Sequence, residues 1–301
     1  MSGERIAKLD GIELAYETFG DPADPTMLLV MGLGAQMIHW DEELCEMFVK
    51  RGFHVVRFDN RDAGHSSKIT GGPRPNVRQA LFGNTSSASY TLDDMADDAA
   101  GLLDNLEVEA AHVVGASQGG MIGQTLAVRH PQRVLSLASI MSTTGKRRVG
   151  RPRLRAYGAL LRAGPRDRDA FIEYVVRMFR RIGSPGFPRD EERLRKMAAL
   201  AYDRSYDPVA TARQLMAIMA SGDRTQALRG IRAPTVVIHG TRDPLVPLRA
   251  GRATARAIPG ARLVEIPGMG HDLPRGVWPT IVEAVVDNAA RARARAEQRA
   301  A

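Results

Sequence analysis

The sequence predicts an α/β protein with a mostly parallel sheet that is covered by helices on both faces. Short apolar runs, such as Thr26 to Met31 and Pro234 to His239, have the continuous hydrophobicity of buried parallel strands. Stretches with helical periodicity alternate with these runs, as expected when helices cross between parallel strands. At 301 residues, with 44% hydrophobic and 25% charged residues, the chain is long enough to build a large core.

The elements expected before residue 144 follow from local patterns. In chain order they are a hairpin over 5–19, a strand over 26–31, a helix near 40–51, a strand over 53–58, an irregular loop over 67–90, a helix over 92–106, a strand over 111–114 followed by a helix, and a strand over 133–140. Thr91 is the predicted N-cap of the 92–106 helix, because threonine is favoured at this position. Asp93 and Asp94 in the first turn interact favourably with the dipole of the helix.

The alternation of strands and helices stops at about residue 144 and resumes at about residue 230. Only helical signals occur between them, and such a segment is too long for one connection within a compact domain. We therefore predict a core formed by residues 1–143 and 230–301, with residues 144–229 inserted as a helical cap. The elements expected after the insertion are a strand over 234–239, a helix ending near 257, a strand over 261–266 and a helix from about 275 into an arginine-rich tail.

The positive charge of the chain is concentrated in the predicted cap. The formal net charge is +8, and residues 146–204 contain 17 Lys or Arg and 7 Asp or Glu, which is +10 and leaves −2 elsewhere. Basic segments can bind nucleic acid. Here the charges are interspersed with apolar residues at helical spacing, and no nucleic-acid motif accompanies them. We therefore interpret the segment as an arginine-rich helical face in solvent and expect no nucleic-acid partner.

One stretch, Gly115-Ala116-Ser117-Gln118-Gly119, matches the pattern G-x-S-x-G. A short apolar strand precedes it and a helical run follows it, which is the context that a nucleophile elbow requires. In such a turn the serine hydroxyl is exposed above the sheet, and the small neighbours prevent collisions with the adjacent strand or helix. The alternative is an ordinary turn serine. The flanking elements favour a catalytic Ser117.

A serine nucleophile needs a base, and the base needs an acid that holds its tautomer. His271 and Asp243 both follow predicted strands, so they are expected at the carboxyl edge of the sheet together with Ser117. Taken singly, Asp243 could be a turn residue before Pro244, and His271 could be a surface histidine. Their common location and the order Ser, Asp, His favour a catalytic triad.

An oxyanion hole is the third requirement of this chemistry. The backbone N–H of Gln118, which follows the nucleophile, is one expected donor. The second is expected from the glycine-bracketed loop after the 26–31 strand, and Leu33 is our choice there. The side chain of Gln118 could also make the pocket more polar.

The chain outside the insertion contains four characteristic blocks: Leu28-Leu29-Val30-Met31-Gly32, Asp59-Asn60-Arg61-Asp62-x-Gly64-x-Ser66, His112-Val113-Val114-Gly115-x-Ser117 and Asp243-Pro244-Leu245-Val246-Pro247. With these blocks it resembles the α/β-hydrolase superfamily. With Phe19-Gly20-Asp21-Pro22 upstream of Met31-Gly32, it resembles in particular the aclacinomycin methylesterase group and related actinobacterial proteins of lipase or esterase type. The resemblance implies hydrolysis of a carboxylic ester through an acyl-serine intermediate. A lactonase, a carbon–carbon bond hydrolase or a cofactor-free perhydrolase would use the same triad. A non-catalytic binding protein is the remote alternative.

Other expectations concern ligands, partners and location. The histidines are scattered and Cys45 is the single cysteine, so neither a metal site nor a cofactor is expected. The N-terminus lacks a signal-peptide core and no apolar run reaches the length of a membrane span, so we expect a cytoplasmic protein. Its expected partner is a small-molecule ester. The oligomeric state, monomer or homodimer, stays open. Apolar cap residues are candidates to line the pocket: Tyr157, Leu160, Leu161, Phe171, Tyr174, Val175 and Met178.

Overall fold

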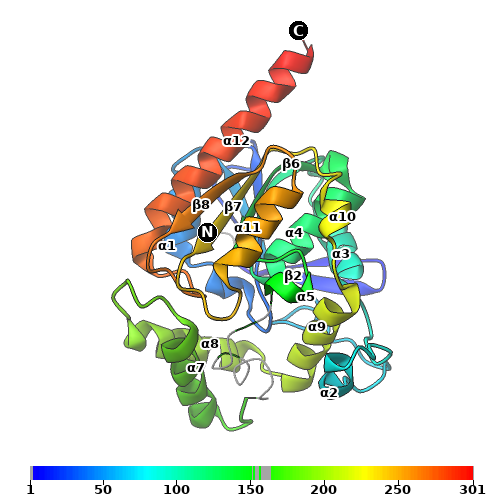
Figure 1. Cartoon of the computed structure of the whole chain (residues 1–301), viewed down its shortest axis with the longest axis vertical. Coiled ribbons are helices and arrows are strands. Elements are labelled where there is room, and N and C mark those ends of the chain that lie inside the picture. Colours follow the sequence, from blue (N-terminus) through cyan, green and yellow to red (C-terminus); the bar gives the residue numbers. More distant parts are fainter. Residues whose placement is uncertain (1–2, 151, 153–155, 157–163, 301) are drawn as a thin grey trace.

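The computed structural model describes residues 3–150, 152, 156 and 164–300 (Figure 1). The strands of the sheet are β1 (Arg5–Leu9), β2 (Ile12–Phe19), β3 (Thr26–Val30), β4 (His54–Phe58), β5 (Ala111–Ala116), β6 (Val134–Ile140), β7 (Thr235–Gly240) and β8 (Arg262–Ile266). The helices that surround it are α1 (Glu42–Val49), α2 (Val77–Leu81), α3 (Leu92–Asn105), α4 (Gln118–Arg129), α11 (Leu248–Ala257) and α12 (Trp278–Ala300). Short 3-10 turns occur at Met37–His39, Pro131–Arg133 and Arg275–Val277.

The eight strands form one sheet in the order β1-β2-β4-β3-β5-β6-β7-β8. β1 pairs antiparallel with β2, and β2 pairs antiparallel with β4, whereas the other pairs are parallel. The sequence prediction of a mostly parallel sheet that begins with a hairpin is therefore confirmed. Because β3 to β8 run in one direction, the loops that follow them meet at one edge of the sheet.

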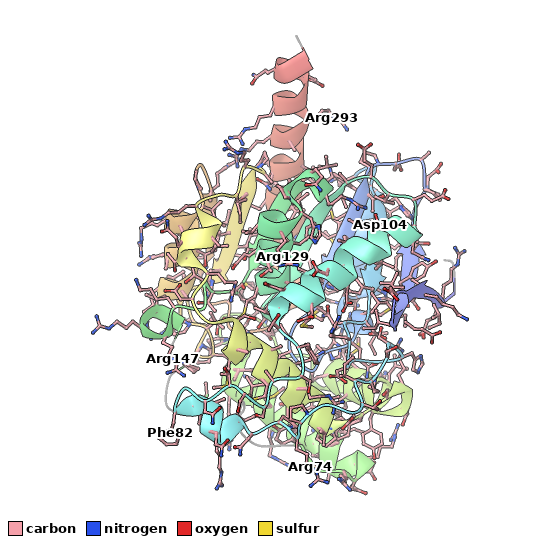
Figure 2. All side chains as sticks on the ribbon, turned by 90° about the vertical axis from the view of Figure 1, so that its right-hand side faces the viewer. Arg74, Phe82, Asp104, Arg129, Arg147 and Arg293 are labelled. Atoms are coloured by element: carbon pink, nitrogen blue, oxygen red, sulfur yellow. The ribbon has the colours of Figure 1, made fainter. Side chains whose placement is uncertain are left out.

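Helices cover both faces of the sheet, as predicted. Alternate residues of β3 point to opposite faces: Leu28 and Val30 belong to the apolar cluster under α3 and α4, and Met27 and Leu29 to the cluster under α1 and α12. This period of two, with burial on both sides, explains why the strand sequences are continuously apolar. Figure 2 shows α3 and α4 side by side on one face, where Arg129 of α4 forms an ion pair with Asp97 of α3 at 2.7 Å.

Most predicted elements lie within a few residues of their expected bounds. Thr91 caps α3, as predicted, since its side chain accepts a hydrogen bond from the backbone N–H of Asp93. The 67–90 segment differs from the prediction because it contains the five-residue helix α2, whose N-terminus is capped by Asn76. A helix of little more than one turn has too few residues to show a periodic pattern. Phe82, at the end of α2, is 90% exposed (Figure 2).

Between β6 and β7 the described residues contain helices and no strand. These helices are α5 (Arg147–Gly150), α7 (Arg168–Ile182), α8 (Glu191–Arg204), α9 (Pro208–Ser221) and α10 (Thr225–Leu228). Figure 1 shows α7, α8 and α9 at the end of the molecule opposite the C-terminal end of α12. Asp167, Asp190 and Asp207 each cap one of these three helices by accepting a hydrogen bond from a backbone N–H.

The residues of the segment 144–229 that were predicted to line a pocket divide into two groups. Tyr157, Leu160 and Leu161 lie outside the described residues. Phe171, Tyr174, Val175 and Met178 lie on α7 and are half-buried. The ring of Phe171 packs against Tyr202 of α8 at 5.5 Å and against Tyr206 at 4.2 Å between ring centroids. Phe171 therefore stabilises the packing of α7 on α8.

The C-terminal helix α12 starts against the sheet and ends beyond it. Residues Ile281, Val282 and Val285 pack into the core, and the C-terminal part of the helix projects away from the body of the molecule (Figure 1). Among the described helices, including this one, none combines the length and the apolar character that crossing a membrane would require.

Candidate active site

Ser117 lies at a sharp turn between β5 and α4, with φ 55° and ψ −115°. A positive φ costs a residue with a side chain about 1–3 kcal/mol, so the surrounding structure must enforce the turn. The flanking glycines allow it. A Cβ on Gly115 would lie 2.2 Å from the carbonyl oxygen of Gly119, and a Cβ on Gly119 would lie 2.0 Å from that of Val30. No side chain fits at either position, as expected for the G-x-S-x-G pattern.

The structure brings the three predicted triad side chains together. His271 Nδ1 lies 2.7 Å from Asp243 Oδ2, and His271 Nε2 lies 3.0 Å from Ser117 Oγ. An ionised carboxylate is only an acceptor, so the Nδ1–H of His271 donates to Asp243. Nε2 then carries the lone pair and accepts the hydrogen bond from the hydroxyl of Ser117. This protonation pattern is the one in which histidine can remove the serine proton.

Asp243 is fully buried and its second oxygen is also bonded. Oδ1 accepts hydrogen bonds of 2.8 Å from the backbone N–H groups of Leu245 and Val246. These donors hold the carboxylate in place and compensate for its loss of water. The proline-containing loop after β7 thereby presents Oδ2 to His271.

A second histidine, His239, lies near Asp243 without competing for it. Its Nε2 donates to the carbonyl oxygen of Val246 at 2.7 Å and is 3.9 Å from Asp243 Oδ2. Burial is the main cause that lowers the pKa of His239, and Asp243 opposes this effect. These contacts place His239 in the packing of the loop after β7, outside the hydrogen-bonded series that reaches Ser117.

The loop after β3 lies directly against the serine turn. A Cβ on Gly32 would be 3.1 Å from Ser117 Cβ and 3.7 Å from the backbone nitrogen of Gln118. The next residue in this loop is Leu33, which is partly exposed. The adjacent N–H of Gly34 donates to Gln214 Oε1 of α9 at 2.8 Å. The two predicted oxyanion donors, Leu33 and Gln118, therefore belong to segments that contact each other beside Ser117.

The side chain of Gln118 is buried and does not make an open pocket more polar. It is 0% exposed, and its Nε2 donates to the carbonyl oxygen of Gln214 at 3.3 Å and lies 3.6 Å from Met95 Sδ. The expectation of a polar pocket wall at this position is wrong. The start of α4 turns this side chain toward α3 and α9, an orientation that depends on tertiary packing.

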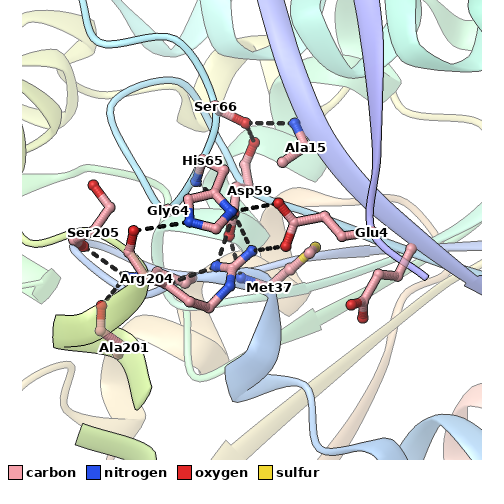
Figure 3. Close-up of polar contacts among 12 residues, drawn as sticks. Glu4, Ala15, Met37, Asp59, Gly64, His65, Ser66, Ala201, Arg204 and Ser205 are labelled. Carbon is pink, nitrogen blue, oxygen red and sulfur yellow. Dashed lines mark hydrogen bonds and ion pairs between the residues drawn. The ribbon is translucent and has the colours of Figure 1, made fainter. Parts of the chain in front are cut away.

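A polar cluster joins the C-terminal end of α8 to the core (Figure 3). The fully buried carboxylate of Asp59 accepts hydrogen bonds from Arg204 Nη1 and Nη2 at 3.1 and 3.0 Å. Arg204 also donates to Gln36 Oε1 and Glu4 Oε2, each at 2.6 Å. His65 lies between Glu4 and the carbonyl oxygen of Arg204, at 2.5 and 2.8 Å. These contacts hold α8 on the loops that follow β3 and β4.

A second buried ion pair joins α9 to the core. Arg213 donates to both carboxylate oxygens of Asp62, with distances of 2.8 and 2.7 Å. The interpretation of the basic segment as a face in solvent holds for Arg168, whose side chain is 44% exposed. It is wrong for Arg204, whose side chain is 9% exposed and pairs with the buried Asp59. Arg213, which lies beyond that segment, is 12% exposed and pairs with the buried Asp62.

Ser184 and Asp272 lie near His271, and neither carries a sequence signal that predicts a role. Ser184, in the loop after α7, accepts a hydrogen bond of 2.8 Å from the backbone N–H of Gly270 and donates to Asp272 Oδ1. In the sequence, the glycine- and proline-rich stretch 183–188 indicates only the end of a helix. Its contact with the loop after β8 joins residues 88 positions apart and depends on the fold.

The part of the chain described by the structure contains no group of three or more His, Cys, Asp or Glu side chains arranged to hold a metal ion. Cys45 is buried in α1, and burial raises the pKa of its thiol to about 12. A thiol with so high a pKa is a poor nucleophile at neutral pH.

The mostly parallel sheet, with a strained serine at a strand–helix turn and a histidine in hydrogen-bond contact with it, is the architecture of a hydrolase with an α/β core. The chain belongs to the α/β hydrolase fold family, whose sequence profile matches residues 25–274.

Among its relatives, rhodomycin D methylesterase of Streptomyces peucetius is 31% identical over 93% of this chain and 96% of that protein. A bifunctional esterase/perhydrolase of Acinetobacter calcoaceticus is 25% identical over 92% and 95% of the two chains. The crystal structure of an enol-lactonase from Burkholderia xenovorans has a TM-score of 0.71 and 26% identity, covering 94% of this chain and 99% of its own. The family match and the methylesterase relative confirm the predicted resemblance and the predicted class of enzyme, an esterase.

Proposed function

We propose that the protein hydrolyses a carboxylic ester through an acyl-serine intermediate, with Ser117 as nucleophile, His271 as base and acid, and Asp243 as the residue that orients His271. The single observation that carries this proposal is the continuous hydrogen-bonded series from Asp243 through His271 to Ser117, with distances of 2.7 and 3.0 Å.

In the first half of the reaction, Ser117 Oγ attacks the ester carbonyl carbon while His271 Nε2 takes its proton. The resulting imidazolium is stabilised by Asp243 and then gives the proton to the departing alcohol oxygen. In the second half, His271 takes a proton from water, the hydroxide attacks the acyl carbon, and the carboxylic acid leaves as Ser117 recovers its proton. Each half transfers one proton through the same nitrogen.

The negative oxygen of both tetrahedral intermediates requires donors that are already in place. We propose the backbone N–H groups of Gln118 and Leu33. Gln118 begins α4, so its N–H belongs to the unpaired first turn of the helix. The contact of Gly32 with the serine turn supports the N–H of Leu33 as the second donor. A donor of this type contributes about 3 kcal/mol to stabilising the transition state.

Methyl esters are the substrate class that we propose to test first, because a methylesterase is 31% identical over nearly the whole chain. We also propose that residues 144–229 act as a cap over a core of residues 1–143 and 230–301. The contacts of α8 and α9 with the loops after β3 and β4 support this division. Exchange of the cap with that of a relative should then change the preferred ester, and unchanged preference would contradict the proposal.

The test is hydrolysis of methyl esters and p-nitrophenyl esters of increasing acyl length by the wild type, Ser117→Ala and Ser221→Ala. Ser221 is a matched control, since its hydroxyl bonds to Ala217 and Leu92. We expect Ser117→Ala to lose at least about 1,000-fold in kcat and Ser221→Ala to keep it. A fluorophosphonate should modify Ser117 in the wild type.

Three outcomes would contradict the proposal. Full activity of Ser117→Ala would show that another residue is the nucleophile. Fluorophosphonate labelling of Ser117 without turnover of any ester would support Ser117 as the nucleophile but contradict the ester as the substrate class. Lactone hydrolysis, carbon–carbon bond cleavage and perhydrolysis would then be assayed with the same variants. Absence of both labelling and turnover would favour a non-catalytic binding protein.

A further inference from the structure

We propose that Ser184 is a positioning residue for His271, so that a hydroxyl of the loop after α7 sets the orientation of the base. This inference rests on the proposed function, because it assigns a role to the contacts around the proposed general base. The segment concerned, which we name the cap loop, comprises residues 182–187. It lies against the histidine loop, residues 267–273, which follows β8.

The backbones of the two loops are in direct contact. The N–H of His271 donates to the carbonyl oxygen of Ile182 at 2.7 Å, and the N–H of Gly186 donates to the carbonyl oxygen of Gly268 at 3.0 Å. A Cβ on Gly270 would lie 2.2 Å from the carbonyl oxygen of Gly183. No side chain fits between the loops there, so a shift of the cap loop displaces the histidine loop as well.

The hydroxyl of Ser184 connects the residues on both sides of His271. It accepts a hydrogen bond of 2.8 Å from the N–H of Gly270 and donates its own proton to Asp272 Oδ1. Ser184 is 6% exposed, so water does not replace these bonds easily. The cap loop therefore bonds to the N–H of His271, to the N–H of the preceding residue and to the side chain of the following residue.

Asp272 makes this arrangement sensitive to the hydroxyl. Burial is the largest cause and raises the pKa of Asp272, whereas the hydrogen bond from Ser184 and the charge of His271 lower it. Loss of the hydroxyl removes the side-chain donor of this largely buried carboxyl group, which keeps only the hydrogen bond from the backbone of Ser184, and it also frees the N–H of Gly270. The N–H of Gly270 must then find a new partner, which requires the histidine loop to move.

Movement of the histidine loop displaces His271 and thereby slows the transfer of the proton from Ser117. His271 bridges Ser117 and Asp243 at 3.0 and 2.7 Å, and reaction rates fall by about 100-fold for a misplacement of 1 Å. A smaller displacement is expected here, because the two backbone hydrogen bonds remain. We therefore expect Ser184→Ala to lower kcat by about 10-fold, with KM changed less than about twofold.

The experiment compares the wild type with Ser184→Ala, Ser184→Cys and Ser221→Ala. The thiol of Ser184→Cys keeps nearly the shape of the serine but is a weaker hydrogen-bonding group, so this variant separates hydrogen bonding from packing. Ser221→Ala removes a different hydroxyl, one that joins α9 to the start of α3. Two quantities are measured: kcat and KM for the best ester, and the low-field proton NMR resonance of the His271–Asp243 hydrogen bond.

The proposal predicts a shifted or exchange-broadened resonance and a lower kcat in both Ser184 variants, and wild-type behaviour in Ser221→Ala. It is overturned if the resonance and kcat of the Ser184 variants match the wild type, or if Ser221→Ala shows the same losses. The NMR measurement does not depend on turnover. If no ester is hydrolysed but the resonance changes only in the Ser184 variants, the proposed function fails and the positioning role of Ser184 stands.

Discussion

The buried ion pair between Arg213 and Asp62 gives the most quantitative test of how the helices after β6 are held on the core. The proposed change is Arg213→Met, which keeps most of the apolar stem and removes the guanidinium. The matched control is Arg168→Met in α7. Arg168 binds Asp203 with the same bidentate geometry, at 2.7 Å for both bonds, but the two side chains are 44% and 52% exposed.

The difference in burial determines the expected cost. Asp62 is fully buried in this pair, and removal of one partner of a buried pair costs about 3–5 kcal/mol because the other charge stays desolvated. Asp62 keeps hydrogen bonds from the hydroxyl of Tyr90 and the N–H of Ile69, at 2.7 and 2.9 Å. We therefore expect Arg213→Met to lower the free energy of unfolding by about 3 kcal/mol, the lower end of this range. The exposed pair is screened by solvent, and Arg168→Met should leave the unfolding midpoint unchanged.

Urea unfolding at pH 7, followed by circular dichroism, measures both variants against the wild type. A loss of about 3 kcal/mol corresponds to a fall in the midpoint on the order of 1 M urea. The double variant Arg213→Met with Asp62→Asn should recover part of the loss, since the uncompensated charge is gone. Equal midpoints for Arg213→Met and Arg168→Met, or no recovery in the double variant, would refute the reasoning from burial.

Three further predictions concern pH, the serine turn and the triad. Burial lowers the pKa of His112 to about 4, whereas an unfolded histidine has a pKa of about 6.5. As the pH falls from about 6.5 to 4, the unfolded chain alone gains this proton, so about 3 kcal/mol of stability is lost. His112→Phe should lack this loss when urea unfolding is compared at pH 7 and pH 4. Gly119→Ala should lower kcat by about 100-fold, because its Cβ would lie 2.0 Å from the carbonyl oxygen of Val30 and would displace the serine turn. Gly230→Ala is the control in the same steady-state assay, because its Cβ would lie 3.3 Å from the carbonyl oxygen of Ala227, and it should keep the wild-type kcat. Asp243→Asn should lower kcat by about 10,000-fold at an unchanged melting temperature, and a fall of less than tenfold would contradict its orienting role.

The elements that the sequence predicted well are those with a complete local signal. The strand β3 is apolar on both faces, and Thr91 with two acids after it specifies the start of α3. The helix α2 was missed because its five residues are fewer than two helical turns. For the candidate site, the sequence located Ser117, Asp243 and His271, since each follows a strand of a parallel sheet.

The sequence by itself determined the class of the fold, the serine turn and the order of the three proposed catalytic residues. These features depend on the spacing of apolar residues and on glycines at positions where no side chain fits. Tertiary structure alone decided the contacts of Ser184 with Gly270 and Asp272, the burial of Arg213 and the orientation of Gln118. Each of these contacts joins segments that are between 23 and 151 residues apart in the chain. The surroundings of Arg213 and of Ser184 depend on which distant segment packs against each residue. The local sequence does not show which segment that is.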